Sequence, residues 1–182
     1  GAAYSGSFTC DLPHGSFYVK EADTTEGYIL DGTKYPVNFN YTNQTTATVA
    51  IVANDGNVIE NIIIRGDIAG HKVSETDADL SDAVMGLFKE GETEFTESTA
   101  LLTDTSDING AFDFTDVAYG RYIVREIKAP MGYALNTTEY PVEVTTDGQV
   151  IEMDLVNEVT KFDIAKTDIA TGDYVIGAQL AI

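Results

Sequence analysis

The sequence has little cysteine, few basic side chains and no long apolar run. Its single cysteine, Cys10, cannot form an internal disulfide, so a secreted form of the protein would need another source of strength. Ten lysine and arginine residues stand against 30 acidic residues, which gives a formal net charge of −20. Nucleic acids and anionic membranes both attract basic surfaces, so this charge argues against either as a partner. No apolar run reaches the length of a transmembrane helix, and the opening residues GAAYSGSFTC lead us to expect a mature or excised piece.

Short runs of β-branched and aromatic residues are abundant, and clusters of Gly, Asp, Asn and Thr separate them. Examples are YPVNFNY, GAFDF, YPVEVTT and VIEMDLV. This pattern predicts an all-β chain. The segment LSDAVMGLFKEG is compatible with a helix or a strand, and we favour a strand around Met85–Phe88. No nucleophile-elbow, P-loop, zinc-binding or paired-carboxylate motif is present, so we expect no cofactor, no metal site and no enzyme acting on outside substrates.

An internal repeat organises the chain. GSFYVKEADTTEGYILDGTKYPVNF, which begins at residue 15, aligns with GRYIVREIKAPMGYALNTTEYPVEV at a constant shift of 105 residues. NIIIRGDIAGHKV follows the first copy and NEVTKFDIAKTD follows the second, and DAVMGL resembles the terminal GAQLAI. We therefore predict the back part of one module in residues 1–61, a complete module in 62–158, and the first strands of a third in 159–182.

Three polar residues of the central module lie at strand positions that alternation assigns to the core: Lys72, Glu126 and Asn157. Glu126, for example, shares its face with Tyr122 and Val124. A buried polar group is costly unless it is paired. Three of them in one small module therefore need a joint explanation.

The joint explanation is an amide bond between the side chains of Lys72 and Asn157. Burial lowers the pKa of Lys72, so a neutral amine becomes available as a nucleophile. Glu126, as a buried protonated acid, is expected to polarise the Asn157 carboxamide and then to shuttle the proton. Attack on the side-chain carbonyl expels ammonia, while folding supplies the proximity. Simpler interpretations stay open: Glu126 as an edge-strand carboxylate, Lys72 as a side chain that extends to solvent, and Asn157 as a turn residue.

The tract GAFDFTDVAYGRYIVREIKAPMGYAL resembles CnaB-type domains, the B-repeat modules of Gram-positive collagen adhesins, which are similar to SpaA-type pilin domains. Its most specific part is E-x-x-A-P-x-G-Y, met by Glu126, Ala129, Pro130, Gly132 and Tyr133. The first copy has Thr24 and Thr25 where Ala-Pro is expected. The resemblance implies tandem prealbumin-like (reverse immunoglobulin) β-sandwiches of seven strands. It also implies a spontaneous Lys–Asn or Lys–Asp bond and service as a stalk or pilus subunit.

The leading prediction is thus a structural stalk or pilus-shaft segment at the bacterial cell surface, whose partners are neighbouring modules or copies of the same protein. The alternative is an adhesin module that recognises a host matrix protein or glycan, with the loop Lys89–Ala100 as its candidate site. The acidic loops SETDADLSD and TDTSDINGAF lack the spacing of a calcium-binding EF-hand, which favours solvated loops. Cys10 aligns near Phe114, so we expect a small buried hydrophobe rather than a thioester cysteine.

Two further sites are predicted to be incomplete. The first piece has an acid, Glu21, and an acceptor, Asn61, whereas the last piece has a lysine, Lys166, on the face of Phe162 and Ile164. The plain explanation is that the chain is cut from a longer tandem array. Alternatively the ends are complementary, and Lys166 of one chain bonds Asn61 of the next after β-strand addition. Such a head-to-tail contact would build a filament.

Overall fold

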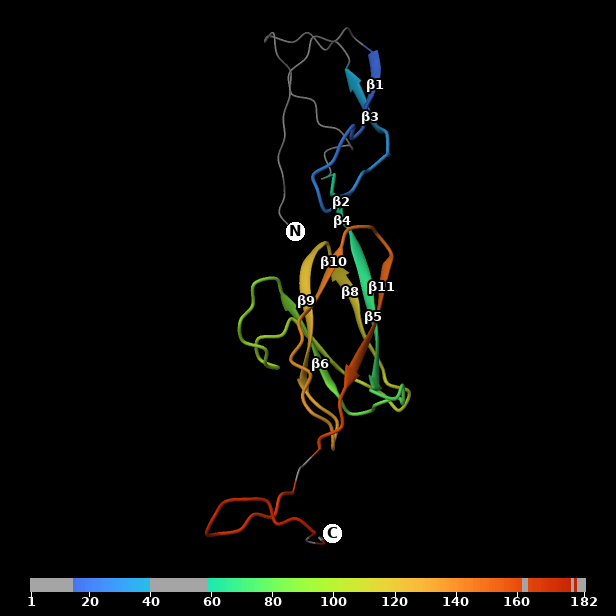
Figure 1. The fold of residues 1–182 in the computed structure, drawn as a ribbon. Coiled ribbons are helices and arrows are strands. Elements are labelled where there is room, and N and C mark those ends of the chain that lie inside the picture. The colour runs from blue at the N-terminus through green and yellow to red at the C-terminus, as the bar shows by residue number, and fades with distance from the viewer. Residues whose placement is uncertain (1–14, 40–58, 162–163, 178, 180–182) are drawn as a thin grey trace.

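The computed structural model describes residues 15–39, 59–161, 164–177 and 179, and every regular element in them is a strand (Figure 1). Cys10 and Phe162 lie outside the described residues. The all-β prediction is confirmed, and so is the strand around Met85–Phe88. The strands are β1 (Gly15–Val19), β2 (Tyr28–Ile29), β3 (Tyr35–Phe39), β4 (Ile62–Ile63), β5 (Arg65–Ser74), β6 (Val84–Lys89), β7 (Leu102–Thr105), β8 (Ala111–Ala118), β9 (Gly120–Lys128), β10 (Tyr140–Val144) and β11 (Gln149–Asn157).

Strands β5 to β11 form a sandwich of two sheets. One sheet has four strands in the order β10-β9-β6-β7, and the other has three in the order β11-β5-β8. All pairs are antiparallel except β11 with β5, which run parallel. The first and last strands of the sandwich are therefore neighbours, and these are the seven strands that the resemblance implied.

Alternating apolar side chains from both sheets fill the space between them, as the period of two along a strand requires. Gly70 has no side chain, and the ring of a neighbouring residue fills the space where one would lie. Gly70 pairs with Phe112 of β8, and a Cβ on residue 70 would lie 1.9 Å from the Phe112 ring. The buried core consists of Ile68, Ala83, Met85, Leu87, Phe112, Phe114, Val117, Val124, Val142, Val144 and Leu155.

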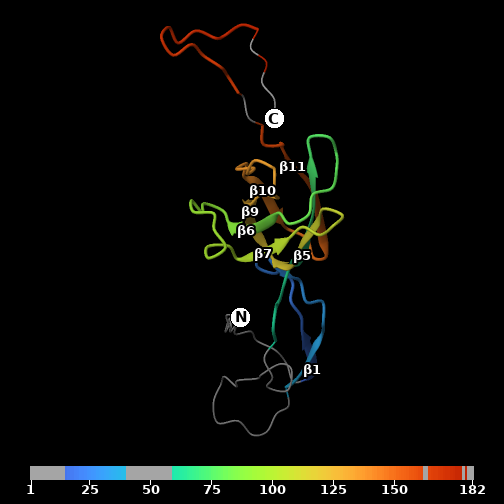
Figure 2. The same cartoon turned by 90° about the horizontal axis from the view of Figure 1, so that it is seen from below.

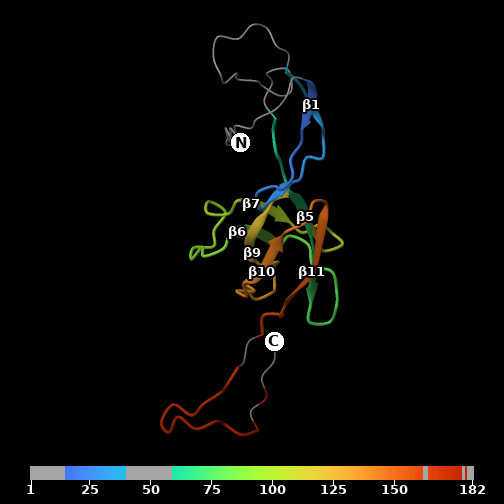
Figure 3. The same ribbon diagram turned by 90° about the horizontal axis from the view of Figure 1, so that it is seen from above.

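The remaining described residues lie beyond the two ends of the sandwich, as Figures 2 and 3 also show. On one side are two small sheets, β1 with β3 and β2 with β4, and β4 leads almost directly into β5. On the other side, residues 164–177 make a turn that an isolated bridge between Thr167 and Tyr174 closes. Within the described part of the chain, no helix is long and apolar enough to cross a membrane.

Candidate functional site

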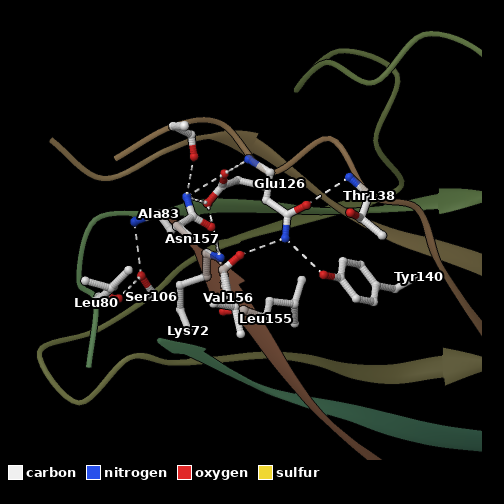
Figure 4. A network of polar contacts seen from close by, with 12 residues as sticks. Lys72, Leu80, Ala83, Ser106, Glu126, Thr138, Tyr140, Leu155, Val156 and Asn157 are labelled. Atoms are coloured by element: carbon white, nitrogen blue, oxygen red, sulfur yellow. Dashed lines mark hydrogen bonds and ion pairs between the residues drawn. The ribbon is translucent and has the colours of Figure 1, made fainter. Parts of the chain in front are cut away.

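Lys72, Glu126 and Asn157 meet at one end of the sandwich core (Figure 4). Lys72 on β5 and Asn157 on β11 come from the three-stranded sheet, whereas Glu126 reaches them from β9 of the facing sheet. All three point inward because each shares the strand face that carries the core. Their side chains are closed off from solvent, with exposed fractions of 0% for Lys72 and 1% each for Glu126 and Asn157.

The lysine amine lies directly against the asparagine carboxamide. Lys72 Nζ contacts Asn157 Oδ1, donates a hydrogen bond to the Leu155 carbonyl at 3.1 Å and lies 3.5 Å from Glu126 Oε1. Asn157 Nδ2 donates to both carboxylate oxygens of Glu126, at 3.0 and 2.9 Å, and to the Ala134 carbonyl at 3.0 Å. Glu126 therefore bridges the amine and the amide nitrogen.

The surroundings favour an uncharged amine. Desolvation lowers the pKa of Lys72, and the nearby negative charge of Glu126 opposes that effect without cancelling it. The contact that Glu126 makes differs from the expected one. Its carboxylate accepts hydrogen bonds from Nδ2 of the Asn157 carboxamide and does not contact the carbonyl oxygen. In the predicted reaction, Glu126 would therefore be placed to protonate the departing nitrogen rather than to polarise the C=O bond.

A model of the SpaA prealbumin-like fold domain matches residues 66–159, a span of more than half of the chain. The chain belongs to this SpaA family. Among solved structures, the Bacillus anthracis TIE protein shares the fold with a TM-score of 0.67 and 22% identity, over 91% of this chain and 32% of that one.

Two pilins are also similar. The major pilin subunit BcpA of Bacillus cereus has 28% identity and a TM-score of 0.44, over 51% of this chain and 28% of its own. The full-length major pilin SpaD of Corynebacterium diphtheriae has 20% identity and a TM-score of 0.42, over 53% and 30%. This chain thus spans about a third or less of each of these three proteins. No curated protein sequence matched it.

Asn136 is a member of the SpaA-domain site that the sequence analysis missed. Its backbone N–H donates to Glu126 Oε2 at 2.7 Å, and its side-chain Nδ2 donates to the Tyr140 hydroxyl and the Val156 carbonyl, both at 2.9 Å. These bonds tie the carboxylate of β9 to β10 and β11. The available signal was the repeat, which aligns Asn136 with Asp31 and Tyr140 with Tyr35.

The residues predicted for the first piece also come together. Asn61 Nδ2 donates to Glu21 Oε1 at 3.0 Å, and the backbone N–H of Asp31 donates to Glu21 Oε2 at 2.8 Å. The Asp31 N–H lowers the pKa of Glu21 below its ordinary value. No lysine of the described residues bonds to Glu21 or Asn61, and Lys166 lies exposed beyond the other end of the SpaA domain.

The alternative sites have less support. Within the described residues, no group of three or more His, Cys, Asp or Glu side chains is arranged to hold a metal ion. In the loop Lys89–Ala100, the Phe95 ring packs edge-on against Phe88, with ring centres 5.0 Å apart, and the Arg125 guanidinium lies 4.1 Å from its centre. The aromatic side chain of this loop is thus packed onto the SpaA domain.

Proposed function

We propose that this chain is a segment of a shaft or stalk at a bacterial cell surface, and that a Lys72–Asn157 amide bond locks its SpaA domain. The observation that carries the proposal is the buried contact of Lys72 Nζ with the Asn157 carboxamide, bridged by Glu126. Membership of the SpaA family also supports the proposal, because this contact lies within the prealbumin-like domain that defines the family. The chemistry acts once, on the chain itself, and requires no outside substrate and no cofactor.

The bond forms by transfer of the Asn157 acyl group. The neutral Lys72 amine attacks Cγ of Asn157, and Glu126, 3.5 Å from that amine, accepts a proton from it. Glu126 then delivers a proton to Nδ2, to which it is already hydrogen-bonded. The Cγ–Nδ2 bond breaks and ammonia leaves, so Glu126 returns to the protonation state in which it started. The closed site excludes water that would compete as the nucleophile.

The position of the bond suits a domain that is pulled from both of its ends. The chain enters the sandwich at the start of β5 and leaves it at the end of β11, and these two strands are parallel neighbours. A pull on the two ends would shear one strand along the other. An amide between Lys72 and Asn157 carries that load directly, so residues 73–156 bear none of it. This is the mechanical argument for a shaft over a ligand-binding module.

The test is the intact mass of the denatured protein. We expect the wild-type chain to weigh one ammonia less than its sequence requires, and the Glu126→Ala variant to have the full mass. The bond spans 85 residues, so by the chain-entropy relation for crosslinks its loss lowers the free energy of unfolding by about 4–5 kcal/mol. Glu143→Ala, which removes an exposed carboxylate from neighbouring β10, is the matched control and keeps the deficit.

Two outcomes contradict the proposal. A wild-type chain of full mass would exclude the bond. A mass deficit that persists in Glu126→Ala would leave the bond in place but remove the role of Glu126.

A further inference from the structure

A histidine on the outer face of β5 joins three elements at the end of the SpaA domain where the chain leaves it. His71 Nε2 lies 2.9 Å from Asp79 Oδ1, in the turn of residues 75–80, and Nδ1 lies 3.5 Å from Asp154 Oδ1 on β11. The ring also lies against Gly110, in the loop before β8, where a Cβ would be 3.0 Å from the ring. His71 is therefore in contact with the turn, with β11 and with the loop.

The same turn holds the exit segment, which we define as residues 158–161. The backbone N–H of Glu75 donates to the Asn157 carbonyl at 3.2 Å. The Glu75 carboxylate accepts hydrogen bonds from Val159 N and from Lys161 Nζ, both at 3.1 Å. The bond with Lys161 lowers the pKa of Glu75, so this carboxylate is charged at neutral pH. One side chain of the turn thus fastens the exit segment at two points.

The amide bond proposed above gives the exit segment no support, because that bond ends at Asn157. Beyond it, backbone hydrogen bonds join Ala134 N to the Glu158 carbonyl at 2.9 Å and Thr160 N to the Gly132 carbonyl at 2.8 Å. The remaining hold comes from Glu75. A pull on the exit segment is therefore passed in part to the 75–80 turn.

The turn is in its own right fixed at its base. Leu80 N donates to the Lys72 carbonyl at 2.9 Å, and Ser74 N donates to the Ala78 carbonyl at 2.8 Å. The contact between Asp79 and His71 adds a side-chain tie from the turn to the outer face of the sheet. How firmly the turn resists a pull therefore depends on the state of His71.

The charged groups that face His71 come from each of the three elements, and they are carboxylates: Asp79 in the turn, Asp154 on β11 and Asp107 in the loop before β8. The hydrogen bond with Asp79 raises the pKa of His71 above its ordinary value of 6.5, and the charge of Asp154 acts in the same direction against desolvation. Only the imidazolium can donate from both ring nitrogens at once. A neutral His71 therefore gives up its contact on one side.

We propose that His71, Asp79 and Asp154 form a pH-sensitive clasp, which holds the exit segment through the 75–80 turn when His71 is protonated and loosens as the pH rises. Because the folded-state pKa is raised, the contribution of the clasp is complete below the ordinary value and is lost as the pH rises through the folded-state value. The clasp does not require the amide bond. Its use in a shaft rests on the proposed function: a joint that loosens just outside a covalent lock lets the shaft bend while the SpaA domain stays closed.

Trypsin cleavage after Lys161 tests the clasp, because this side chain must leave Glu75 before the protease can bind it. The full chain and its variants are digested at about pH 6 and at about pH 8.5, and the products are identified by mass. At the lower pH we expect His71→Gln and Asp79→Asn to be cut faster than wild type by about two- to fivefold, the range that exposed ion pairs support. At the higher pH, wild type and His71→Gln should be cut at the same rate.

Two controls separate the clasp from other effects. Comparison of variants at one pH cancels the pH dependence of the protease, and cleavage after the exposed Lys166 is the internal reference. Asp77→Asn removes the same charge from the same turn, at a residue that makes no ion pair with His71 and whose φ of +60° asparagine tolerates. It should leave the cleavage rate unchanged.

The titration of His71 is measured on the same proteins by NMR. The chain has two histidines, His14 and His71, so the ring signal of His71 is the one that disappears in His71→Gln. We expect its midpoint to lie above 6.5 in the wild type and to fall in Asp79→Asn.

Three results would overturn the proposal. Equal cleavage of wild type and His71→Gln at both pH values would show that backbone bonds and Glu75 hold the exit segment without the clasp. Faster cleavage of His71→Gln by the same factor at both pH values would assign His71 a packing role that does not depend on its charge. A His71 midpoint at or below 6.5 would remove the attraction on which the clasp depends. In each case the mass of the denatured chain still decides the amide bond separately.

Discussion

At the scale of single residues, the site depends on a lysine that the fold deprives of water. Lys72 is fully buried, and its polar contacts are the Leu155 carbonyl, the Asn157 carboxamide and the Glu126 carboxylate. A charged ammonium in such a place costs free energy. The proposed amide bond would remove this cost permanently, because an amide nitrogen does not titrate.

An unlinked variant should therefore gain stability as the pH rises. In Asn157→Ala the amine stays free, and desolvation keeps its folded-state pKa below the ordinary value of 10.5. Between those two values the unfolded chain binds more protons than the folded one, so the free energy of unfolding increases with pH. Urea titrations from about pH 7 to about pH 10 measure the slope.

Comparison with a second variant isolates the contribution of Lys72 to this pH dependence. Lys72→Met combined with Asn157→Ala retains every other titrating group, including Tyr122, whose pKa burial raises. We expect the upward slope to be absent from the double variant. Equal slopes in the two variants would show that Lys72 is not the group responsible.

The sequence was sufficient to predict which three polar side chains meet in the core, but not that Asn136 joins them. Lys72, Glu126 and Asn157 each interrupt an apolar alternation, which is visible without a structure. Asn136 acts on Glu126 through its backbone N–H, and any residue has that group. The side of the carboxamide that Glu126 contacts was likewise beyond prediction, since it depends on how two sheets pack.

At the scale of elements, the β5 strand combines two requirements. It pairs with β11 on one edge and with β8 on the other, and its inward face must hold both Lys72 and Gly70, whose missing side chain leaves room for the Phe112 ring. The alternation of apolar and polar residues predicted which side chains of β5 point into the core, because this pattern can be read from neighbouring residues. Its parallel partner, β11, is some 80 residues away in the sequence, and only the closed sandwich brings the two strands together.

Gly70→Ala should test this strand directly. The added Cβ would meet the Phe112 ring at 1.9 Å, so β5 and β8 would have to separate or the ring would have to leave its place. Overpacking of this kind costs about 1–3 kcal/mol, measured as a lower melting temperature. Gly32→Ala is the control, because its Cβ would meet nothing within 4 Å. A Gly70→Ala protein as stable as the control would show that the ring adjusts without cost.

At the scale of the whole molecule, the junction before the SpaA domain is a packed contact. The Tyr119 hydroxyl donates to Glu26, and the Tyr119 backbone N–H donates to the Ile64 carbonyl at 2.8 Å. The ring also covers Gly27, which has a φ of +86° and where a Cβ would lie 2.8 Å from the ring. The repeat predicted boundaries from sequence similarity, but this contact joins residues that no repeat pairs.

Tyr119→Ala should loosen this junction. Arg65, the first residue of β5, follows β4 with only Ile64 between them and has an exposed side chain, so trypsin cleavage after it reports local opening. We expect cleavage to be faster by about tenfold in Tyr119→Ala, which corresponds to about 1.4 kcal/mol of local stability. Tyr119→Phe, which keeps the ring over Gly27 and loses the bond to Glu26, should fall between. Tyr174→Ala removes an exposed tyrosine beyond the other end and should leave the rate unchanged. Equal rates in Tyr119→Ala and wild type would mean that backbone bonds alone hold the two parts together.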